Sequence, residues 1–196
     1  MNETSKSIFK KLSDSRYATR YIVGDGIDIG AGQDSLDQYF EFFPLAKSCM
    51  NWDLVNGDAQ YLKGVSDNSF DFVNSSHCLE HMQDPNVALN NWLRILKTGG
   101  YLLLSVPDED LYEQGIFPST YNADYKHTFT IYKQSSWCSN SINLFDLLSS
   151  TDYSLQILKI ELLDSTYKYR TSQVSRMDQS MTAIGECAIE VILKKL

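Results

Sequence analysis

The sequence predicts an α/β fold: a mostly parallel sheet, flanked by helices, with an antiparallel C-terminal edge hairpin. Three observations predict it. In the first half of the chain, short apolar runs alternate with helical patterns, as in a parallel sheet. Glycines and acidic residues follow these runs directly, at the positions where strands of such a sheet meet a ligand. In the second half, residues 153–163 and 186–193 alternate apolar and polar side chains like half-exposed strands.

The elements of the first half follow one another in a regular order. The segment between the second and third strands has no helical pattern, whereas the next helix is strongly amphipathic and is closed by Gly99 and Gly100. The expected elements are a strand at 21–29, a helix at 35–43 that ends before Pro44, strands at 47–52 and 69–74, a helix at 85–97 and a strand at 101–107.

Outside this core, the patterns are less regular. Residues 108–132 lack periodicity and are rich in Tyr, Pro, Asn and Asp, which predicts a long loop or cap over the sheet. A helix is expected at 136–148. The polar segment 165–184 joins the two strands of the edge hairpin. At the N-terminus, a loose arm or short helix would place Ile8, Phe9 and Leu12 on one face.

The chain length predicts a single domain. Its 196 residues, of which 43% are hydrophobic, suffice for one well-buried core. Within residues 1–196 we therefore distinguish an N-terminal arm (1–20), a core (21–107) and two cap segments (108–132 and 165–184).

Charge and cysteine usage exclude several functions. A formal net charge of -8 without a Lys or Arg cluster would repel nucleic acid. The four cysteines are scattered, with no C-x-x-C pair to suggest a zinc ribbon, and are interpreted as buried thiols in a reducing compartment. Neither a signal sequence nor an apolar stretch of about 20 residues is apparent. We expect a cytoplasmic protein that contacts neither nucleic acid nor membrane.

The stretch GIDIGAGQD, residues 26–34, sets the first functional question. Gly30 and Gly32 follow an apolar run, where backbone N–H groups could meet a ligand. A dinucleotide fingerprint needs a third glycine, but Ser35 stands at that position. The acidic Asp28 would repel phosphate and attract an ammonium group. On these residues alone, a tight turn is the alternative.

Four blocks occur in an order that resembles the class I S-adenosylmethionine-dependent methyltransferases, in particular their small bacterial methyltransferase-11-type domain. The resemblance covers roughly residues 22–107. It implies a Rossmann-like methyltransferase sandwich, with S-adenosylmethionine as cofactor. The blocks are DIGAG at 28–32, Asp53 after the second strand, GDA at 57–59, and the run from SFD at 69–71 through HCLEH at 77–81 to RILKTGG at 94–100.

The resemblance also implies roles for individual residues. Gly30, Ala31 and Gly32 would pass close to the cofactor, while Asp28 helps to hold its amino-acid end. Asp53 would accept hydrogen bonds from the ribose hydroxyls. The remaining implied contacts are Asp58 with the adenine amino group, Ala59 in the adenine pocket, and Ser76 and His77 near the methionine portion. Asp53 and Asp58 could instead cap turns.

Each of the three histidines, His77, His81 and His127, has alternatives. The segment HCLEH also has the spacing of an inverted zinc-protease motif, His77-x-x-Glu80-His81, which would need a long helix and a third ligand. In a methyltransferase, His81 would pack on the loop or act as a general base. His127, in the cap, could take a proton from an acceptor hydroxyl or lie on the surface. We expect no metal site and choose His127 and His81 as candidate catalytic residues.

The acceptor is inferred from the cap segments. Tyr121, Tyr125, Lys126 and Arg170 are candidate substrate-binding residues, a mixture that suits a small, polar, sugar-like or phosphorylated molecule. The run from Pro107 to Tyr132 is also similar to segments of methyltransferases of bacterial surface-polysaccharide biosynthesis. We therefore expect O-methylation of a sugar-, nucleotide- or phosphate-containing metabolite. The competing hypothesis is an inactive, cofactor-binding regulatory subunit.

Overall fold

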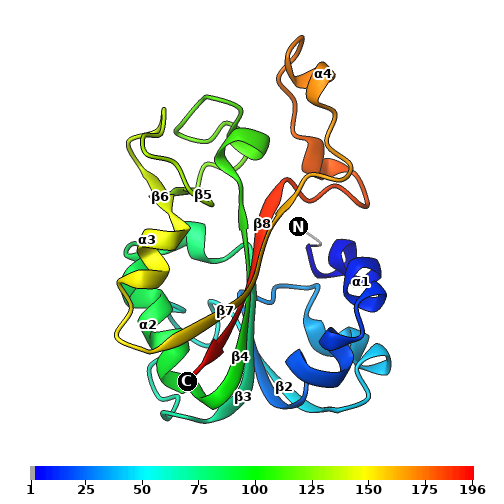
Figure 1. Cartoon of the computed structure of the whole chain (residues 1–196), viewed down its shortest axis with the longest axis vertical. Coiled ribbons are helices and arrows are strands. Elements are labelled where there is room, and N and C mark those ends of the chain that lie inside the picture. Colours follow the sequence, from blue (N-terminus) through cyan, green and yellow to red (C-terminus); the bar gives the residue numbers. More distant parts are fainter. Residues whose placement is uncertain (1–2) are drawn as a thin grey trace.

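A six-stranded sheet forms the centre of the computed structural model, which describes residues 3–196 (Figure 1). The strand order is β2-β1-β3-β4-β8-β7. The first four strands in this order are parallel, and β8 is antiparallel to both β4 and β7. The predicted sheet with its antiparallel C-terminal hairpin is thus confirmed. The strands are β1 (Gly24–Ile29), β2 (Ala46–Trp52), β3 (Phe70–Ser76), β4 (Leu96–Pro107), β7 (Leu155–Leu163) and β8 (Ala188–Lys195).

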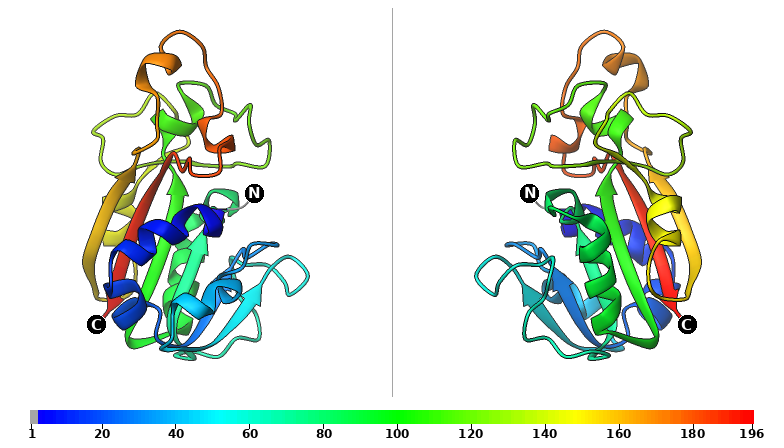
Figure 2. Two further views of the ribbon diagram at one scale, coloured as in Figure 1. Left: turned by 90° about the vertical axis from the view of Figure 1, so that its right-hand side faces the viewer. Right: turned by 90° about the vertical axis from the view of Figure 1, so that its left-hand side faces the viewer.

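Helices cover both faces of the sheet. α2 (Pro85–Ile95) and α3 (Leu144–Ser149) lie on one face, and α1 (Glu3–Ser13) lies on the other (Figures 1 and 2). Above the sheet, a small parallel pair of strands, β5 (Thr128–Thr130) and β6 (Ser141–Asn143), and a four-residue helix, α4 (Tyr169–Ser172), belong to the upper loops. Five short helical segments complete the described secondary structure: Tyr17–Tyr21, Leu36–Phe42, Leu79–His81, Glu109–Glu113 and Gln179–Met181.

The two faces carry separate hydrophobic clusters because successive strand residues point in opposite directions. Val73 packs toward α2, where Leu89 and Trp92 are fully buried. Its neighbour Phe72 packs toward α1 with Tyr17 and Tyr21. Gly26 lies beside Phe72, and a Cβ atom there would stand only 2.1 Å from the phenyl ring. The glycine therefore makes room for the ring that fills the second core.

In the N-terminal helix α1, the side chains of Ile8, Phe9 and Leu12 do not share one face as predicted. Ile8 is buried, but Phe9 is 77% exposed and Leu12 is 42% exposed. The buried face is mostly polar and consists of Glu3, Thr4, Ser7, Ile8 and Lys11. The reason is the surface below the helix, which offers charged partners on β8 and the segment before it: Lys10 pairs with Glu186 at 3.2 Å and with Glu190 at 3.5 Å. The predicted apolar face was therefore wrong.

Further boundaries also differ from the sequence prediction. The helix expected at 85–97 ends at Ile95, and the strand expected at 101–107 already begins at Leu96. The helix expected at 136–148 is present only as α3, because residues 141–143 pair with β5 instead. The strand expected at 21–29 starts at Gly24, since residues 17–21 form a helical turn whose tyrosines Tyr17 and Tyr21 enter the second core. As expected, residues 53–69 form no helix or strand.

Asp84 fixes the start of α2, and its removal should destabilise the fold. Its carboxylate accepts hydrogen bonds from the backbone N–H groups of Asn86 and Val87, and Pro85 occupies the first helical position. Replacing Asp84 with Ala should lower the free energy of unfolding by about 1 kcal/mol, measured by urea denaturation. The exposed Asp152, whose carboxylate has no hydrogen bond among the described residues, provides the control Asp152→Ala. Equal losses in both variants would contradict a capping role.

Candidate functional site

The loops that follow the parallel strands enclose two adjoining cavities at one edge of the sheet. Gly30 follows β1, Asp53 follows β2 and His77 follows β3. Gly30, His77 and His81 line both cavities, so the two spaces meet at these residues. The first cavity, about 370 Å³, is also lined by Glu3, Thr4, Asp28, Ala31, Gly32, Gln33, Asp34, Ser76, Asn122 and Tyr125. The second, about 820 Å³, is also lined by Asp53, Leu54, Gly57, Asp58, Ala59, Gln60, Tyr61, Cys78, Met82, Gln83, Asp124 and Lys126.

Gly30 brings the loop after β1 against the turn after β3. Its φ of +77° lies in the left-handed region, and an added Cβ would stand 2.7 Å from the Cβ of Cys78. A side chain would thus be both strained and in collision. Gly32 also has a positive φ, +56°, and its N–H donates to Oδ2 of Asp53 at 3.0 Å. The two glycines therefore shape the passage between the cavities.

Asp28 is a buried carboxylate that joins three segments. Its Oδ1 accepts from the amide of Asn74 on β3 at 2.6 Å, and its Oδ2 accepts from the backbone N–H of Leu36 at 2.8 Å. Burial disfavours the charged form and raises the pKa of Asp28 to about 6, although both hydrogen bonds and Lys11 oppose the shift. Both of its oxygens serve the protein itself while the side chain lines the first cavity.

The wall of the second cavity carries the acidic residues predicted for the nucleoside end. Asp53 accepts from the backbone N–H of Leu54 at 2.7 Å with the oxygen that Gly32 does not use. Asp58 accepts from the N–H of Gln60 at 2.8 Å. The carbonyl of Ala59 accepts from the indole of Trp92 in α2 at 2.9 Å, which fixes this turn against the core. Each carboxylate oxygen has a further lone pair for a ligand hydroxyl or amine.

His77 lies between two carboxylates at the junction of the cavities. Its backbone φ is +53°, and its side chain is 6% exposed. Nε2 lies 3.6 Å from Oε2 of Glu3, and Nδ1 lies 3.5 Å from Oε1 of Glu80. Burial alone would lower the pKa of His77, but these carboxylates outweigh burial, so its pKa is raised. Ser76, the residue before it, lines the first cavity.

Of the two candidate catalytic histidines, the structure brings only His81 to the cavities. His81 lies in the helical turn after β3 and lines both spaces. Its Nδ1 lies 2.7 Å from Oδ2 of Asp124, which comes from the cap. His127 lines neither cavity; its Nε2 lies 3.4 Å from the carbonyl oxygen of Gln83. A direct role of His127 stays a prediction without a supporting contact.

The candidate substrate-binding residues are also distributed unevenly. Tyr125 lines the first cavity, and Lys126 lines the second with its ammonium bound to the carbonyl of His81 at 2.6 Å. Tyr121 is stacked under the guanidinium of Arg176, 4.5 Å from the ring centroid. Arg170, in α4, is exposed and lines neither cavity.

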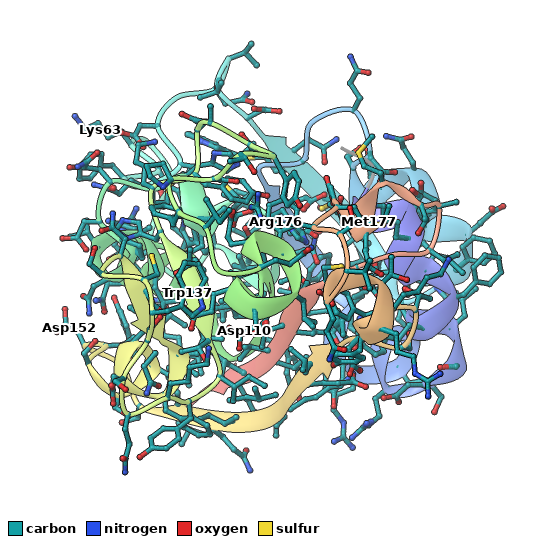
Figure 3. All side chains as sticks on the ribbon, turned by 90° about the horizontal axis from the view of Figure 1, so that it is seen from above. Lys63, Asp110, Trp137, Asp152, Arg176 and Met177 are labelled. Atoms are coloured by element: carbon teal, nitrogen blue, oxygen red, sulfur yellow. The ribbon has the colours of Figure 1, made fainter. Side chains whose placement is uncertain are left out.

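Arg176 is a cap residue that the sequence reasoning did not select as a site residue. It donates to the backbone carbonyl of Glu113 and to the hydroxyl of Thr120, thereby joining the two cap segments. Figure 3 shows Arg176 near the middle of the upper face, beside the helical turn Glu109–Glu113. In the sequence Arg176 stands between Ser175 and Met177, which gives no local signal that separates it from other surface arginines.

The zinc-hydrolase alternative requires a helix that the chain does not form here. Residues 79–81 form a single helical turn, and His77 has a left-handed backbone. The two imidazoles are engaged by different carboxylates, His77 by Glu3 and Glu80, and His81 by Asp124. Among residues 3–196, no group of three or more His, Cys, Asp or Glu side chains is arranged to hold a metal ion.

The sheet order and the glycine and acidic residues at its edge define the class of fold, the Rossmann-like fold of S-adenosylmethionine-dependent methyltransferases. A methyltransferase of this kind from Archaeoglobus fulgidus is similar with a TM-score of 0.57 at 16% identity, over 96% of this chain and 94% of that chain. One from Mesorhizobium loti reaches a TM-score of 0.59 at 13% identity, over 93% and 99%. A Haloferax volcanii protein described as a putative methyltransferase, in complex with the Trm112 methyltransferase activator, reaches 0.56 at 12% identity, over 99% and 98%.

The amino-acid sequence leads to the same class. Residues 26–104 match a family described as "Methyltransferase domain". An uncharacterized methyltransferase of Schizosaccharomyces pombe is 40% identical over 105 residues, which are 52% of this chain and 37% of that protein. The chain thus spans well under half the length of this curated relative. Residues 26–104 are thus similar in sequence to a methyltransferase domain.

Within residues 3–196, none of the helices combines the length and the apolar composition that a bilayer-crossing segment needs.

The buried Asp28 should make stability depend on pH. Between pH 3.8 and about 6 the native state keeps the Asp28 proton that the unfolded chain releases, so raising the pH favours unfolding. Relative to Asp28→Asn, the wild type should lose roughly 3 kcal/mol of unfolding free energy across this window, measured by urea denaturation. Asp28→Asn also loses one hydrogen bond, which adds an offset independent of pH. Asp152→Asn is the control variant. If the unfolding free energies of the wild type and of Asp28→Asn change with pH in parallel, the raised pKa of Asp28 is refuted.

Proposed function

We propose that the protein transfers the methyl group of S-adenosylmethionine to an oxygen of a small, polar acceptor. The observation that carries this proposal is the pair of joined cavities, lined mostly by residues of the segment 26–104 that matches the methyltransferase domain. Each volume, about 370 and 820 Å³, lies within the usual range for small-molecule sites. The two cavities meet at Gly30, His77 and His81. This arrangement suits a cofactor that has an amino-acid end and a nucleoside end.

The residues present fit this cofactor. In the proposal, Asp53 and Asp58 offer carboxylate lone pairs to the ribose hydroxyls and the adenine amine, with Ala59 against the adenine. The loop of Gly30, Ala31 and Gly32 faces open space at Gly32, where an added Cβ would meet no protein atom within 4 Å. The backbone of this loop can therefore approach the ligand closely. Asp28, Ser76 and His77 face the amino-acid end in the first cavity.

The cofactor supplies a methyl group already activated by a sulfonium. The protein's own residues then have three tasks: to align the acceptor, to exclude water and to take a proton. Glu3 and Thr4 of α1 and Tyr125 of the cap line the first cavity and limit its access to water. His81, which lines both cavities, is placed to receive the proton of an acceptor hydroxyl.

The charges around the cavities favour an uncharged acceptor. The first cavity is lined by three carboxylates, Glu3, Asp28 and Asp34, and by no Lys or Arg of the described residues. In the second, Lys126 is the single Lys or Arg among the described lining residues, and its ammonium is bound to the carbonyl of His81. A phosphate would be repelled, so of the acceptors predicted from the sequence, a neutral sugar hydroxyl fits best. A role in surface-polysaccharide biosynthesis stays a prediction from residues 107–132.

Ligand-dependent stability tests the cofactor proposal. We expect S-adenosylmethionine and S-adenosylhomocysteine to raise the melting temperature of the purified protein, whereas NAD and zinc leave it unchanged. A ligand at 100 times its Kd adds about 2.7 kcal/mol of stability. A response to NAD or zinc alone would overturn the proposal, and methylated product from any acceptor would exclude an inactive regulatory subunit.

Asp53 should contribute directly to cofactor affinity. Replacing Asp53 with Ala should weaken S-adenosylhomocysteine binding by roughly 1–3 kcal/mol, because charge-assisted hydrogen bonds to the ribose are lost. Isothermal titration calorimetry measures this change, with Asp152→Ala as the matched control on a distant surface (Figure 3). An unchanged Kd in Asp53→Ala would remove Asp53 from the site.

A further inference from the structure

The imidazole of His81 is oriented by a carboxylate from a different part of the chain. Its Nδ1 lies 2.7 Å from Oδ2 of Asp124, a typical charge-assisted hydrogen-bond length. The other carboxylate oxygen of Asp124 lies 3.7 Å from the ammonium of Lys126. The hydrogen bond to His81 holds the pKa of Asp124 below its usual value. Since a carboxylate can only accept, the hydrogen must reside on Nδ1 of His81.

This contact determines which nitrogen of His81 can act as a base. A neutral imidazole carries one hydrogen, so the other nitrogen, Nε2, keeps its lone pair. Among residues 3–196, Nε2 of His81 has no hydrogen-bond partner, while the ring packs edge-on against Tyr125 with centroids 5.0 Å apart. Asp124 therefore leaves Nε2 available to an acceptor.

The position of His81 places this nitrogen close to the expected reaction. His81, His77 and Gly30 are the lining residues that the two cavities share. If the two ends of the cofactor occupy the two cavities, the sulfonium that connects them must pass these residues. Of the two shared histidines, His77 lies 3.5–3.6 Å from the carboxylates of Glu3 and Glu80, and its Nδ1 has no hydrogen-bond partner among the described residues. His81 is the one whose ring is fixed by a hydrogen bond to a carboxylate.

Hydrogen bonds between the cap and the turn at residues 79–81 keep Asp124 beside His81. The backbone N–H of Lys126 donates to the carbonyl of Glu80 at 2.9 Å, and its ammonium donates to the carbonyl of His81 at 2.6 Å. The N–H of His127 shares the Glu80 carbonyl at 3.3 Å. The loop that carries Asp124 is thus fastened to the turn that carries His81 by both main chain and side chain.

We propose that Asp124 is a positioning residue that makes His81 the general base for a neutral hydroxyl acceptor, an inference that rests on the proposed methyltransferase function. The acceptor O–H proton moves to Nε2 of His81 as the oxygen forms its bond to the methyl carbon. The carbon–sulfur bond breaks, and its electron pair stays on sulfur. The products are a methyl ether, S-adenosylhomocysteine and the imidazolium of His81, which is paired with Asp124. The imidazolium then releases its proton to water.

A hydroxyl is an acceptor that needs a general base. A carboxylate or phosphate acceptor is already ionised and gains nothing from a base, and the acidic lining of the first cavity opposes both. A hydroxyl is a poor nucleophile until its proton leaves, and a positioned base typically contributes ~10²–10⁴-fold to the rate.

The tautomer of His81 can be measured without knowing the acceptor. The chain has three histidines, so ¹⁵N-histidine labelling gives few signals, which His81→Gln and His127→Gln assign. With S-adenosylhomocysteine bound, we expect the neutral form of the His81 ring to carry its hydrogen on Nδ1. In Asp124→Ala this preference should be lost, whereas Asp152→Ala should keep it. A hydrogen on Nε2 in the wild type, or an unchanged tautomer in Asp124→Ala, would overturn the proposal.

Methyl transfer gives a second, independent readout. The probes are methyl α-glucopyranoside, glucosamine and glucose 6-phosphate, each with tritiated S-adenosylmethionine. We expect label in the neutral sugar, a turnover lowered roughly 10²- to 10⁴-fold in His81→Gln, and a large part of that loss in Asp124→Ala at unchanged cofactor Kd. Preferred labelling of the phosphate would overturn the acceptor class. If no probe is labelled, the tautomer result alone decides.

The two proposals fail in different ways. If the wild type binds no S-adenosylhomocysteine in calorimetry, the methyltransferase proposal itself is refuted. If binding is intact but the His81 tautomer is wrong, only the role of Asp124 and His81 is refuted.

Discussion

The buried carboxylate of Asp28 is the contact on which the site depends most. A charged group without water must have its lone pairs satisfied, and Asp28 achieves this by binding Asn74 of β3 and the backbone of Leu36. The first contact fixes β1 against β3, and the second fixes the segment after the glycine loop. One side chain of β1 that lines the first cavity therefore holds two other parts of the chain, β3 and the segment at Leu36. The close approach of Gly30 to Cys78 adds to the same constraint from the opposite side.

Much of the sheet and the cofactor side of the site could be predicted, because both depend on local sequence. Strand patterns fixed the expected order of the elements, and parallel strands place the ends of β1, β2 and β3 at one edge. Gly30 was found from its position directly after a strand, whereas the resemblance to the methyltransferases indicated Asp53 and Asp58. All three residues line the cavities. Their contacts with a cofactor stay predictions.

The cap residues were harder to predict because their positions depend on contacts between segments distant in sequence. His81 and Asp124 are separated by 43 residues and meet only when the cap folds over the turn. Neither periodicity nor spacing indicates such a pair, and His127 had an equally suitable local sequence. The same holds for α1, whose apolar residues gave the wrong face, since its charged partners, Glu186 and Glu190, lie at the other end of the chain.

The polar underside of α1 has a consequence for how ligands reach the first cavity. A helix that buries a wide apolar face is costly to detach, because the apolar surface meets water. α1 buries a single apolar side chain, Ile8, and is otherwise attached through hydrogen bonds and ion pairs. Water can replace each of those contacts in turn, and dissolved salt weakens the ionic ones. Detaching α1 from this wall of the cavity would therefore remove only Ile8 from the second hydrophobic cluster, and solvent would replace the other contacts.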